Sequence, residues 1–179
     1  MSPPADDPHD IFFTGAPDDP RHGCVMIGWM AARAVYLEFE TPPIPTSETL
    51  TTVYRDGRKP AASFEWTMGT HMGMATVGTR TVPMSELVMP GADSSARTFR
   101  TTDGRTFEWR KVHGLPGAYD LNPVPGGPPI ARFSRFAQPQ STPIGPAHAL
   151  LQCRFDDDNL LLEASLALCL NRWVDLHGY

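Results

Sequence analysis

The chain has 179 residues, of which 41% are hydrophobic and 20% charged, and its formal net charge is −5. This length fits one domain, and the 19 prolines and 15 glycines favour many turns over long helices. The chain is acidic and has only two lysines, Lys59 and Lys111, which argues against binding to nucleic acid or to an anionic membrane surface.

The first 22 residues are rich in proline, aspartate and glycine, and we predict a weakly ordered tail at 1–22. The segment has no basic region followed by an apolar run, so it does not resemble a secretory signal. The three cysteines, Cys24, Cys153 and Cys169, are odd in number and show no CxxC spacing. We expect Cys153 and Cys169 to be small buried hydrophobes in a reduced, cytoplasmic protein.

Residues 23–179 are predicted to form a single domain in which short strands precede one helix. In its first half, segments with alternating apolar residues or β-branched residues predict strands. These segments are residues 35–39, 49–54 and 62–66, and residues 24–29 form either a first strand or a segment packed on the rim of a barrel. Proline and glycine separate them, as expected for strands joined by turns.

The clearest hairpin spans residues 97–110. A two-residue Asp-Gly loop would place Phe99 opposite Glu108, which mixes an aromatic ring with a charge on one face. A three-residue loop instead places Phe99 opposite Phe107, with Gly104 in the left-handed position of a G1 bulge. We therefore predict the three-residue loop. The residues then expected to face solvent are Arg100, Thr106, Glu108 and Arg110.

Later strands are predicted at 118–121, 130–136 and 149–155, and residues 157–175 predict one helix that is apolar around its whole circumference. Asp157 or Asp158 is the expected N-cap. A helix of this kind is either a membrane span or the centre of a fold. The run is shorter than the ~20 residues that a bilayer needs, and charged residues interrupt it, so we predict a buried helix and no transmembrane segment. A sandwich has no room for this helix, whereas a β-barrel does.

The Arg97-Thr98-Phe99 and Asp103-Gly104-Arg105-x-Phe107-x-Trp109 hairpin, the Ile130–Phe133 strand and the closing helix together resemble a fungal group of domains of unknown function. That group is similar to the tubby C-terminal and LURP-one-related superfamily, and the resemblance covers roughly residues 30–175. It implies a mainly β fold, a tubby-like antiparallel β-barrel enclosing a hydrophobic C-terminal helix. Tubby-like barrels bind phosphoinositide head groups through lysine and arginine, and scramblase-like relatives sit at membranes. This chain has two lysines and no lipidated cysteine cluster, so a lipid site is not carried over.

Two sets of residues are candidate binding residues. The first is a basic group on one hairpin, formed by Arg97, Arg100, Arg105, Arg110 and Lys111. One interpretation is an anion or phosphate site. The other, which we favour, is a solvated sheet face on which arginines lie beside Glu108, because exposed strand charges commonly protect sheet edges.

The second candidate is Glu163, a carboxylate within the apolar helix. Burial in a barrel disfavours the charged form of a carboxylate, so Glu163 is a candidate acid, base or binding residue. The favoured alternative is that it reaches the barrel mouth or pairs with an arginine such as Arg132 or Arg154.

Other catalytic and metal signals are weak. The sequence has no GxSxG motif, no glycine-rich phosphate loop before a helix and no histidine pair at zinc-binding spacing. The His71-Met72-Gly73-Met74 segment offers too few ligands for copper(I), and we expect its methionines to fill the core. We predict no metal site and no cofactor, and no recognised motif decides whether the chain is an enzyme.

Two hypotheses for the function follow. The first is an intracellular binding or interaction protein on a tubby-like barrel, with a protein or small-molecule ligand that the sequence does not identify. The alternative is an enzyme, or a small-molecule or lipid carrier, with a pocket at the barrel mouth near Glu163. A lumen filled by the helix would favour the first hypothesis and place function on outer surfaces. A pocket beside Glu163 with convergent polar groups would favour the second.

Overall fold

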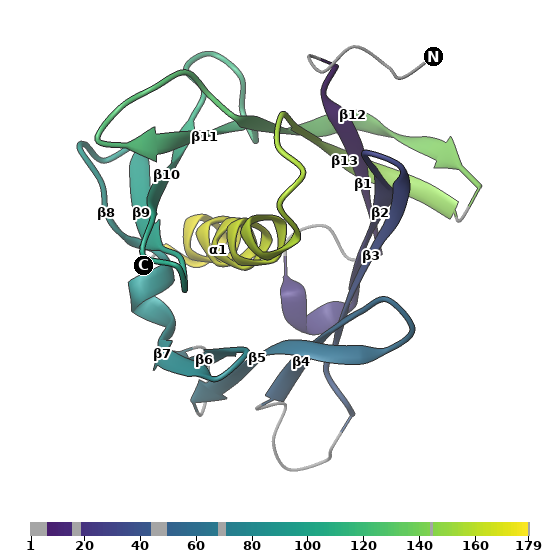
Figure 1. The fold of residues 1–179 in the computed structure, drawn as a ribbon, viewed down its shortest axis with the longest axis horizontal. Coiled ribbons are helices and arrows are strands. Elements are labelled where there is room, and N and C mark those ends of the chain that lie inside the picture. Colours follow the sequence, from purple (N-terminus) through teal and green to yellow (C-terminus); the bar gives the residue numbers. More distant parts are fainter. Residues whose placement is uncertain (1–6, 16–18, 44–49, 68–70, 144, 179) are drawn as a thin grey trace.

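The computed structural model describes residues 7–15, 19–43, 50–67, 71–143 and 145–178. These residues form one antiparallel sheet of 13 strands that curves around a C-terminal helix (Figure 1). The first seven strands are β1 (His9–Gly15), β2 (Cys24–Met30), β3 (Arg33–Glu40), β4 (Leu50–Arg55), β5 (Lys59–Thr67), β6 (His71–Val77) and β7 (Arg80–Pro83). The others are β8 (Met89–Pro90), β9 (Ala96–Arg100), β10 (Thr106–Lys111), β11 (Tyr119–Val124), β12 (Ala131–Thr142) and β13 (Gly145–Cys153). The helices are η1 (Pro20–His22), η2 (Met84–Leu87) and α1 (Asp158–His177).

The sheet is open, and the prediction of a closed β-barrel is wrong. Neighbours in the sheet are also neighbours in sequence, except that β1 pairs with β13. The two edge strands are β7 and β8, and in the described residues no backbone ladder joins them. The mainly β class and the single C-terminal helix are confirmed.

The seam between the two edges has a physical cause. Strand β7 ends at Pro83, and β8 contains only Met89 and Pro90, so both edges carry a residue that cannot donate to a ladder. Between them, η2 turns Met84 and Leu87 into the core, where they are 0% and 1% exposed. Side chains and a short helix therefore fill the seam in place of strand pairing.

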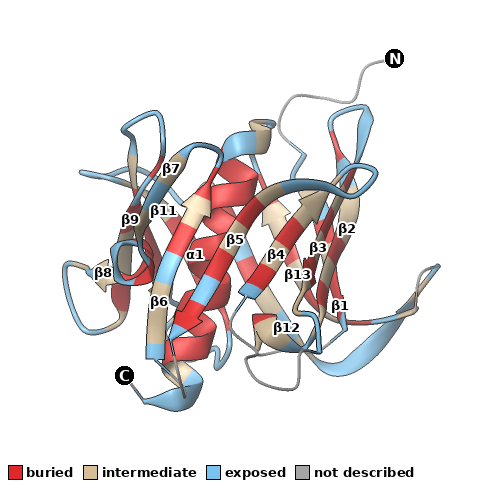
Figure 2. Cartoon of the chain, turned by 90° about the horizontal axis from the view of Figure 1, so that it is seen from below, coloured by how far each residue is buried: buried red, intermediate tan, exposed pale blue. Residues whose placement is uncertain are grey.

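Helix α1 lies at the centre of the molecule, and the predicted buried helix is confirmed. Every residue from 160 to 174 is buried, and the turns of α1 that are visible behind β5 and β6 in Figure 2 are red. Asp157 is the N-cap, since its carboxylate accepts from the amides of Asn159 and Leu160, both at 3.0 Å. In the part of the chain that the structure describes, no helix combines the length and the apolar character needed to cross a membrane.

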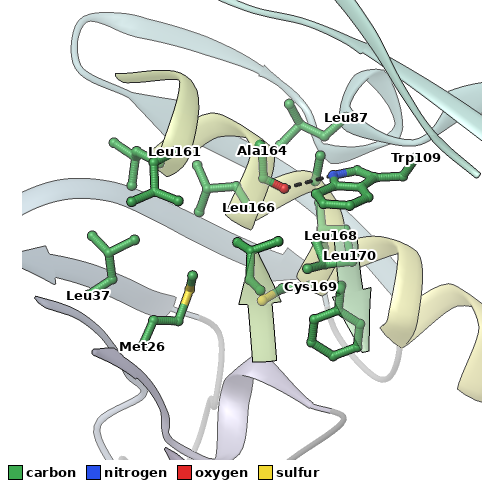
Figure 3. Close-up of a cluster of buried hydrophobic side chains, with 14 of the residues drawn as sticks. Met26, Leu37, Leu87, Trp109, Leu161, Ala164, Leu166, Leu168, Cys169 and Leu170 are labelled. Atoms are coloured by element: carbon green, nitrogen blue, oxygen red, sulfur yellow. Dashed lines mark hydrogen bonds between the residues drawn. The ribbon is translucent and has the colours of Figure 1, made fainter. Parts of the chain in front are cut away.

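The strands contribute their inner faces to one core around α1. Met26 and Leu37 approach the helix on one flank, and Leu87 and Trp109 approach it on another (Figure 3). The buried indole of Trp109 donates to the carbonyl of Ala164 at 2.9 Å, which satisfies its only polar group. Each buried leucine of the helix contributes roughly 1.5–3 kcal/mol, so the core depends on α1.

The predicted tail contains an ordered strand, and the expectation of weak order is wrong for residues 9–15. This segment forms β1, which lies between β2 and β13 in the middle of the sheet. Ile11 and Phe13 point into the core and are 0% exposed. Surrounding proline and aspartate residues hide this short alternation in the sequence.

Three other strands, β6 to β8, were not predicted. In β6 the core positions belong to Ala75 and Val77. Met72 is partly buried against the core, whereas Met74 is 37% exposed. The expectation that both methionines fill the core is therefore wrong for Met74, which lies on the face of β6 opposite to that of Ala75 and Val77. The pairing of β6 with β5 is irregular between His71 and Met74, so Met72 does not follow the same alternation.

The predicted register of the hairpin is confirmed. Phe99 pairs with Phe107, their ring centroids lie 5.9 Å apart, and Gly104 has φ of +89°. Glu108 differs from the prediction, since it is 7% exposed instead of facing solvent. Its carboxylate accepts from the amide of Ala92 at 3.3 Å, so the segment before β9 covers it.

The three cysteines, Cys24, Cys153 and Cys169, are free and buried, as predicted for the last two. Burial raises the pKa of the Cys153 thiol to about 12, so this thiol stays protonated and unreactive.

Candidate functional site

The basic residues of the β9–β10 hairpin point in different directions. Arg97 lies opposite Trp109 on the inner face, near the C-terminal end of α1. Its guanidinium lies 2.9 Å from a carboxylate oxygen of Asp175 and donates to Oδ1 of Asn171 at 3.2 Å. Lys111 reaches the same carboxylate at 3.0 Å. These two cations therefore join the hairpin to the helix.

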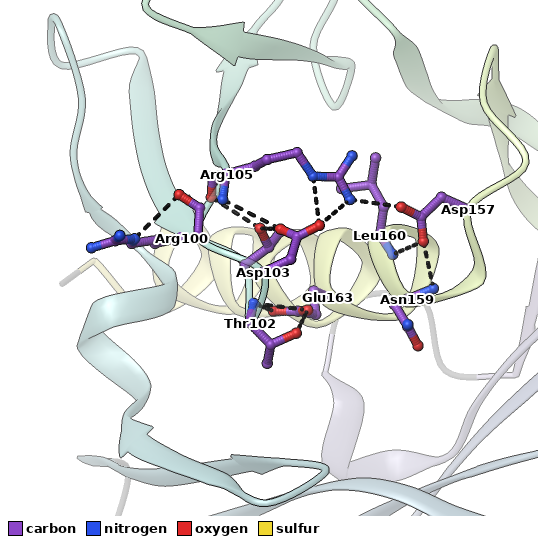
Figure 4. Close-up of polar contacts among 10 residues, drawn as sticks. Arg100, Thr102, Asp103, Arg105, Asp157, Asn159, Leu160 and Glu163 are labelled. Carbon is purple, nitrogen blue, oxygen red and sulfur yellow. Dashed lines mark hydrogen bonds and ion pairs between the residues drawn. The ribbon is translucent and has the colours of Figure 1, made fainter.

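Arg105 and Arg100 serve the hairpin loop. The guanidinium of Arg105 lies 2.7 Å from the carboxylate of Asp103 and 2.6 Å from that of Asp157, the helix N-cap (Figure 4). The hydrogen bond to Asp103 raises the pKa of Arg105 most, and the hydrogen bond to Asp157 raises it further. Arg100 donates to the carbonyl of Gly104 at 3.3 Å. Both arginines hold local structure.

Arg110 completes the set on the outer face. It lies 2.5 Å from Asp93 and 2.7 Å from Glu108. Hydrogen bonds from the Ser95 hydroxyl, which has the larger effect, and from Arg110 lower the pKa of Asp93 to about 2. Four arginines thus meet carboxylates or a carbonyl in separate places, and they share no common focus that would hold one anion.

Glu163 is 2% exposed and contacts the hairpin loop. Its carboxylate accepts from the amide of Thr102 at 2.9 and 3.1 Å and from the Thr102 hydroxyl at 2.7 Å (Figure 4). Pairing with Arg132 was one expectation, but Arg132 lies 2.6 Å from Asp120. Glu163 therefore fastens the loop of the β9–β10 hairpin to the first turns of α1.

Two large hollows lie on the described surface, and Glu163 lines neither. One, of about 620 Å³, lies beside the C-terminal end of α1 and is lined by Lys111, His113, Leu115, Tyr119 and Asp175 among others. In it the Tyr119 hydroxyl donates to Asp175 at 2.5 Å. Burial is the main cause that raises the pKa of Tyr119, and the hydrogen bond to Asp175 raises it further, so the hydroxyl stays protonated.

The larger hollow, of about 720 Å³, lies on the outer face of β1 and β2, and we call it the β1–β2 groove. Phe12 and Ile27 are directly paired across the two strands and form its apolar floor. Trp29 follows on the same face and is 64% exposed. The described residues that line the groove are Pro8, His9, Asp10, Phe12, Ile27, Gly28, Trp29, Ala31, Gln140, Ser141, Thr142 and Pro143.

The strands shape the groove through a close approach and a long hairpin. A Cβ atom on Gly28 would lie 2.2 Å from the carbonyl oxygen of Asp10, so only glycine permits this packing of β1 on β2. The tip of the β12–β13 hairpin supplies a polar wall from Gln140 to Pro143. This groove was not predicted from the sequence. The one signal for it was the outward position of Trp29 in an alternating strand.

Comparison with family models places this chain in a family. The model of a family of unknown function, DUF6593, matches residues 19–163. This chain belongs to that family. The DUF6593 match begins just before η1 and ends at Glu163, so it includes β2 but not β1. Comparison with curated proteins and with solved structures found no match.

Proposed function

We propose that this chain is a non-enzymatic binding protein whose ligand lies in the β1–β2 groove. The groove itself is the observation that carries the proposal. Its volume of about 720 Å³ falls within the range of small-molecule sites, roughly 300–1,000 Å³. An apolar floor with an exposed tryptophan and a polar rim is typical of binding surfaces.

The packed interior of the molecule favours a ligand site on the outer surface. Buried side chains of α1 occupy the space inside the curved sheet, and two of its buried polar residues, Glu163 and Asn171, are engaged in holding the fold. The carboxylate of Glu163 is bound to Thr102, and the side-chain amide of Asn171 donates to the carbonyl of Ala167 at 2.8 Å. The alternative of an enzyme or carrier with a pocket near Glu163 gains no support from these contacts.

A relation to the tubby C-terminal and LURP-one-related superfamily is part of the same proposal. What supports it is a meandering antiparallel sheet that curves around a buried C-terminal helix. An intracellular setting is also proposed, and the three buried free thiols support it.

Neutral apolar probes test the groove. We expect 1-hexanol and benzyl alcohol, titrated into ¹⁵N-labelled protein, to shift the amide signals of Gly28 and Ala31 and the indole signal of Trp29. Trp29→Ala should weaken binding, because it removes the large exposed ring. The matched control is Leu115→Ala, which trims a side chain that is 53% exposed beside the other large hollow. Shifts spread evenly over the surface, or equal effects of the two variants, would contradict the proposal.

A further inference from the structure

We propose that the β1–β2 groove selects an organic cation, an ammonium group that carries an alkyl or aryl chain. This inference rests on the proposed function and specifies the ligand class of that same site. The chain would lie on Phe12 and Ile27, and the cationic head would lie between Trp29 and Asp10.

The charge of the groove is the first argument. Among the described lining residues Asp10 is the only carboxylate, and none is lysine or arginine. Its Oδ1 accepts a hydrogen bond from the side-chain amide of Gln152 at 3.0 Å, which orients the carboxylate without neutralising it. Many other carboxylates of the described chain lie within 4 Å of a cation of the protein, as Asp19, Asp120 and Asp175 do. Among the described residues Asp10 has no such pairing, so its charge is available to a ligand.

His9 lies beside Asp10 in the groove but forms no ion pair with it among the described residues. Its Nδ1 accepts a hydrogen bond from the amide of Ala31 at 3.4 Å, so this ring nitrogen contacts the backbone.

The aromatic surface is the second argument. Asp10 and Phe12 alternate outward on β1, and Ile27 and Trp29 do so on β2, so all four line one face. The face of a tryptophan attracts ammonium groups more strongly than that of other aromatic side chains. A carboxylate adds a direct charge–charge attraction. The pairing of an exposed indole with an unneutralised carboxylate matches the chemistry of a cation that has an apolar body.

The same features disfavour an anionic amphiphile such as a fatty acid. Its carboxylate would meet the charge of Asp10 and would find no arginine or lysine among the described lining residues. The net charge of −5 extends this preference to longer range, because it attracts cations and repels anions.

Three probes with the same hydrocarbon chain test the inference. They are hexyltrimethylammonium, 1-hexanol and hexanoate, each titrated into the full chain and followed by the amide signals of Gly28 and Ala31. We expect the cation to bind about tenfold more tightly than the anion, with the alcohol between them. Equal affinities for cation and alcohol would overturn the cation preference and leave the groove as a binding site. Failure of all three probes to bind would overturn the groove itself.

Two substitutions separate the contributions. Asp10→Asn should lower the affinity for hexyltrimethylammonium several-fold and leave that for 1-hexanol unchanged, because only the cation senses the lost charge. Trp29→Leu keeps an apolar side chain and should weaken binding of the cation more than that of the alcohol. Glu65→Gln, on the exposed face of β5, is the charge-matched control and should change neither. Equal losses in Asp10→Asn and Glu65→Gln would mean that the effect is one of overall charge, which would also overturn the inference.

Discussion

At the scale of single residues, two features define the loop of the β9–β10 hairpin: a backbone conformation and a set of hydrogen bonds. Gly104 takes φ of +89°, a conformation that residues with a side chain adopt at a cost. On the other side of the loop, Glu163 accepts three hydrogen bonds from Thr102. The loop is therefore set both by its own backbone and by the helix beneath it.

We expect Gly104→Val to lower the free energy of unfolding by roughly 1–3 kcal/mol, the usual strain of a β-branched residue in the left-handed region. A Cβ at this position meets only the flexible side chain of Arg100, at 3.5 Å, so backbone strain is the main cause. Gly104→Asn should be much milder. Urea unfolding monitors the effect, with Gly126→Val as control, because Gly126 has open space around it and no positive φ. Equal stabilities of the two valine variants would contradict the argument.

Glu163→Gln is expected to destabilise the protein by about 1–2 kcal/mol, since a neutral amide replaces an acceptor of charge-assisted hydrogen bonds. Thr102→Val removes only the hydroxyl and should cost about 0.5–1.5 kcal/mol. In a double-mutant cycle the two changes should couple, because they remove the same contact. Strict additivity would show that the contact does not contribute in solution.

At the scale of elements, α1 replaces the second layer that a curved sheet needs. Inward side chains of the strands converge on it, and its 15 residues from 160 to 174 are all buried. Without the helix these strands would face an empty space, which close-packed proteins do not tolerate. The helix is therefore a structural requirement for the sheet.

We predict that truncation after Asp156 gives insoluble or molten protein, detected as loss of near-ultraviolet circular dichroism and of a cooperative melting transition. Leu166→Asp should act similarly, because Leu166 is 0% exposed and an unpaired buried charge is severely costly. Leu176→Asp is the matched control, since Leu176 lies on the same helix and is 59% exposed. A soluble truncated chain that melts cooperatively would refute the dependence of the sheet on α1.

At the scale of the whole molecule, carboxylates at both ends of α1 connect it to the sheet. Asp157 binds the helix amides, chiefly that of Leu160, and then Arg105, and these contacts lower its pKa. Burial by itself would raise the pKa of Asp175, but the hydrogen bonds that its carboxylate accepts outweigh burial and lower it. Both groups therefore bind protons more readily in the unfolded chain than in the folded one.

The sign of the pH dependence follows from these two groups. Their contribution to stability is complete above the unfolded pKa of about 3.9 and is lost as the pH falls through the lower folded values. We expect the urea midpoint to be similar at pH 7 and pH 5 and to fall at pH 3. Asp157→Asn and Asp175→Asn should each reduce that fall. Asp156→Asn, at an exposed neighbouring position, should not. A midpoint that rises on acidification would contradict this assignment.

The charges of the outer surface lead to a prediction about membranes. Because the hairpin arginines are held by carboxylates or carbonyls and the net charge is −5, we expect no tight binding to phosphoinositides. In liposome sedimentation at physiological salt, phosphatidylinositol bisphosphate should not increase pelleting, and Arg100→Ala should behave as the wild type. Strong head-group-dependent pelleting that this substitution abolishes would instead establish the hairpin as an anion site.

Local pattern was enough to predict several features. The all-round apolar character of residues 157–175 indicated a buried helix, and the pairing of Phe99 with Phe107 followed from keeping like side chains on one face. Both depend on neighbours that lie close in sequence, where periodicity and turn geometry decide the structure. The mainly β class followed in the same way from short strands between proline and glycine.

Long-range pairing decided the rest. Whether β1 joins the sheet depends on β13, at the opposite end of the chain, and this pairing also places Asp10 and Phe12 beside Trp29. Glu108 is buried only because the segment around Ala92 folds over it. The open seam results from η2 and from prolines on both edges. By itself the sequence determined the central helix, the β9–β10 hairpin and most of the longer strands, because these depend on local alternation; it did not reveal β1 or β6 to β8. Only the tertiary structure decided the groove and the seam, because they arise where distant segments meet.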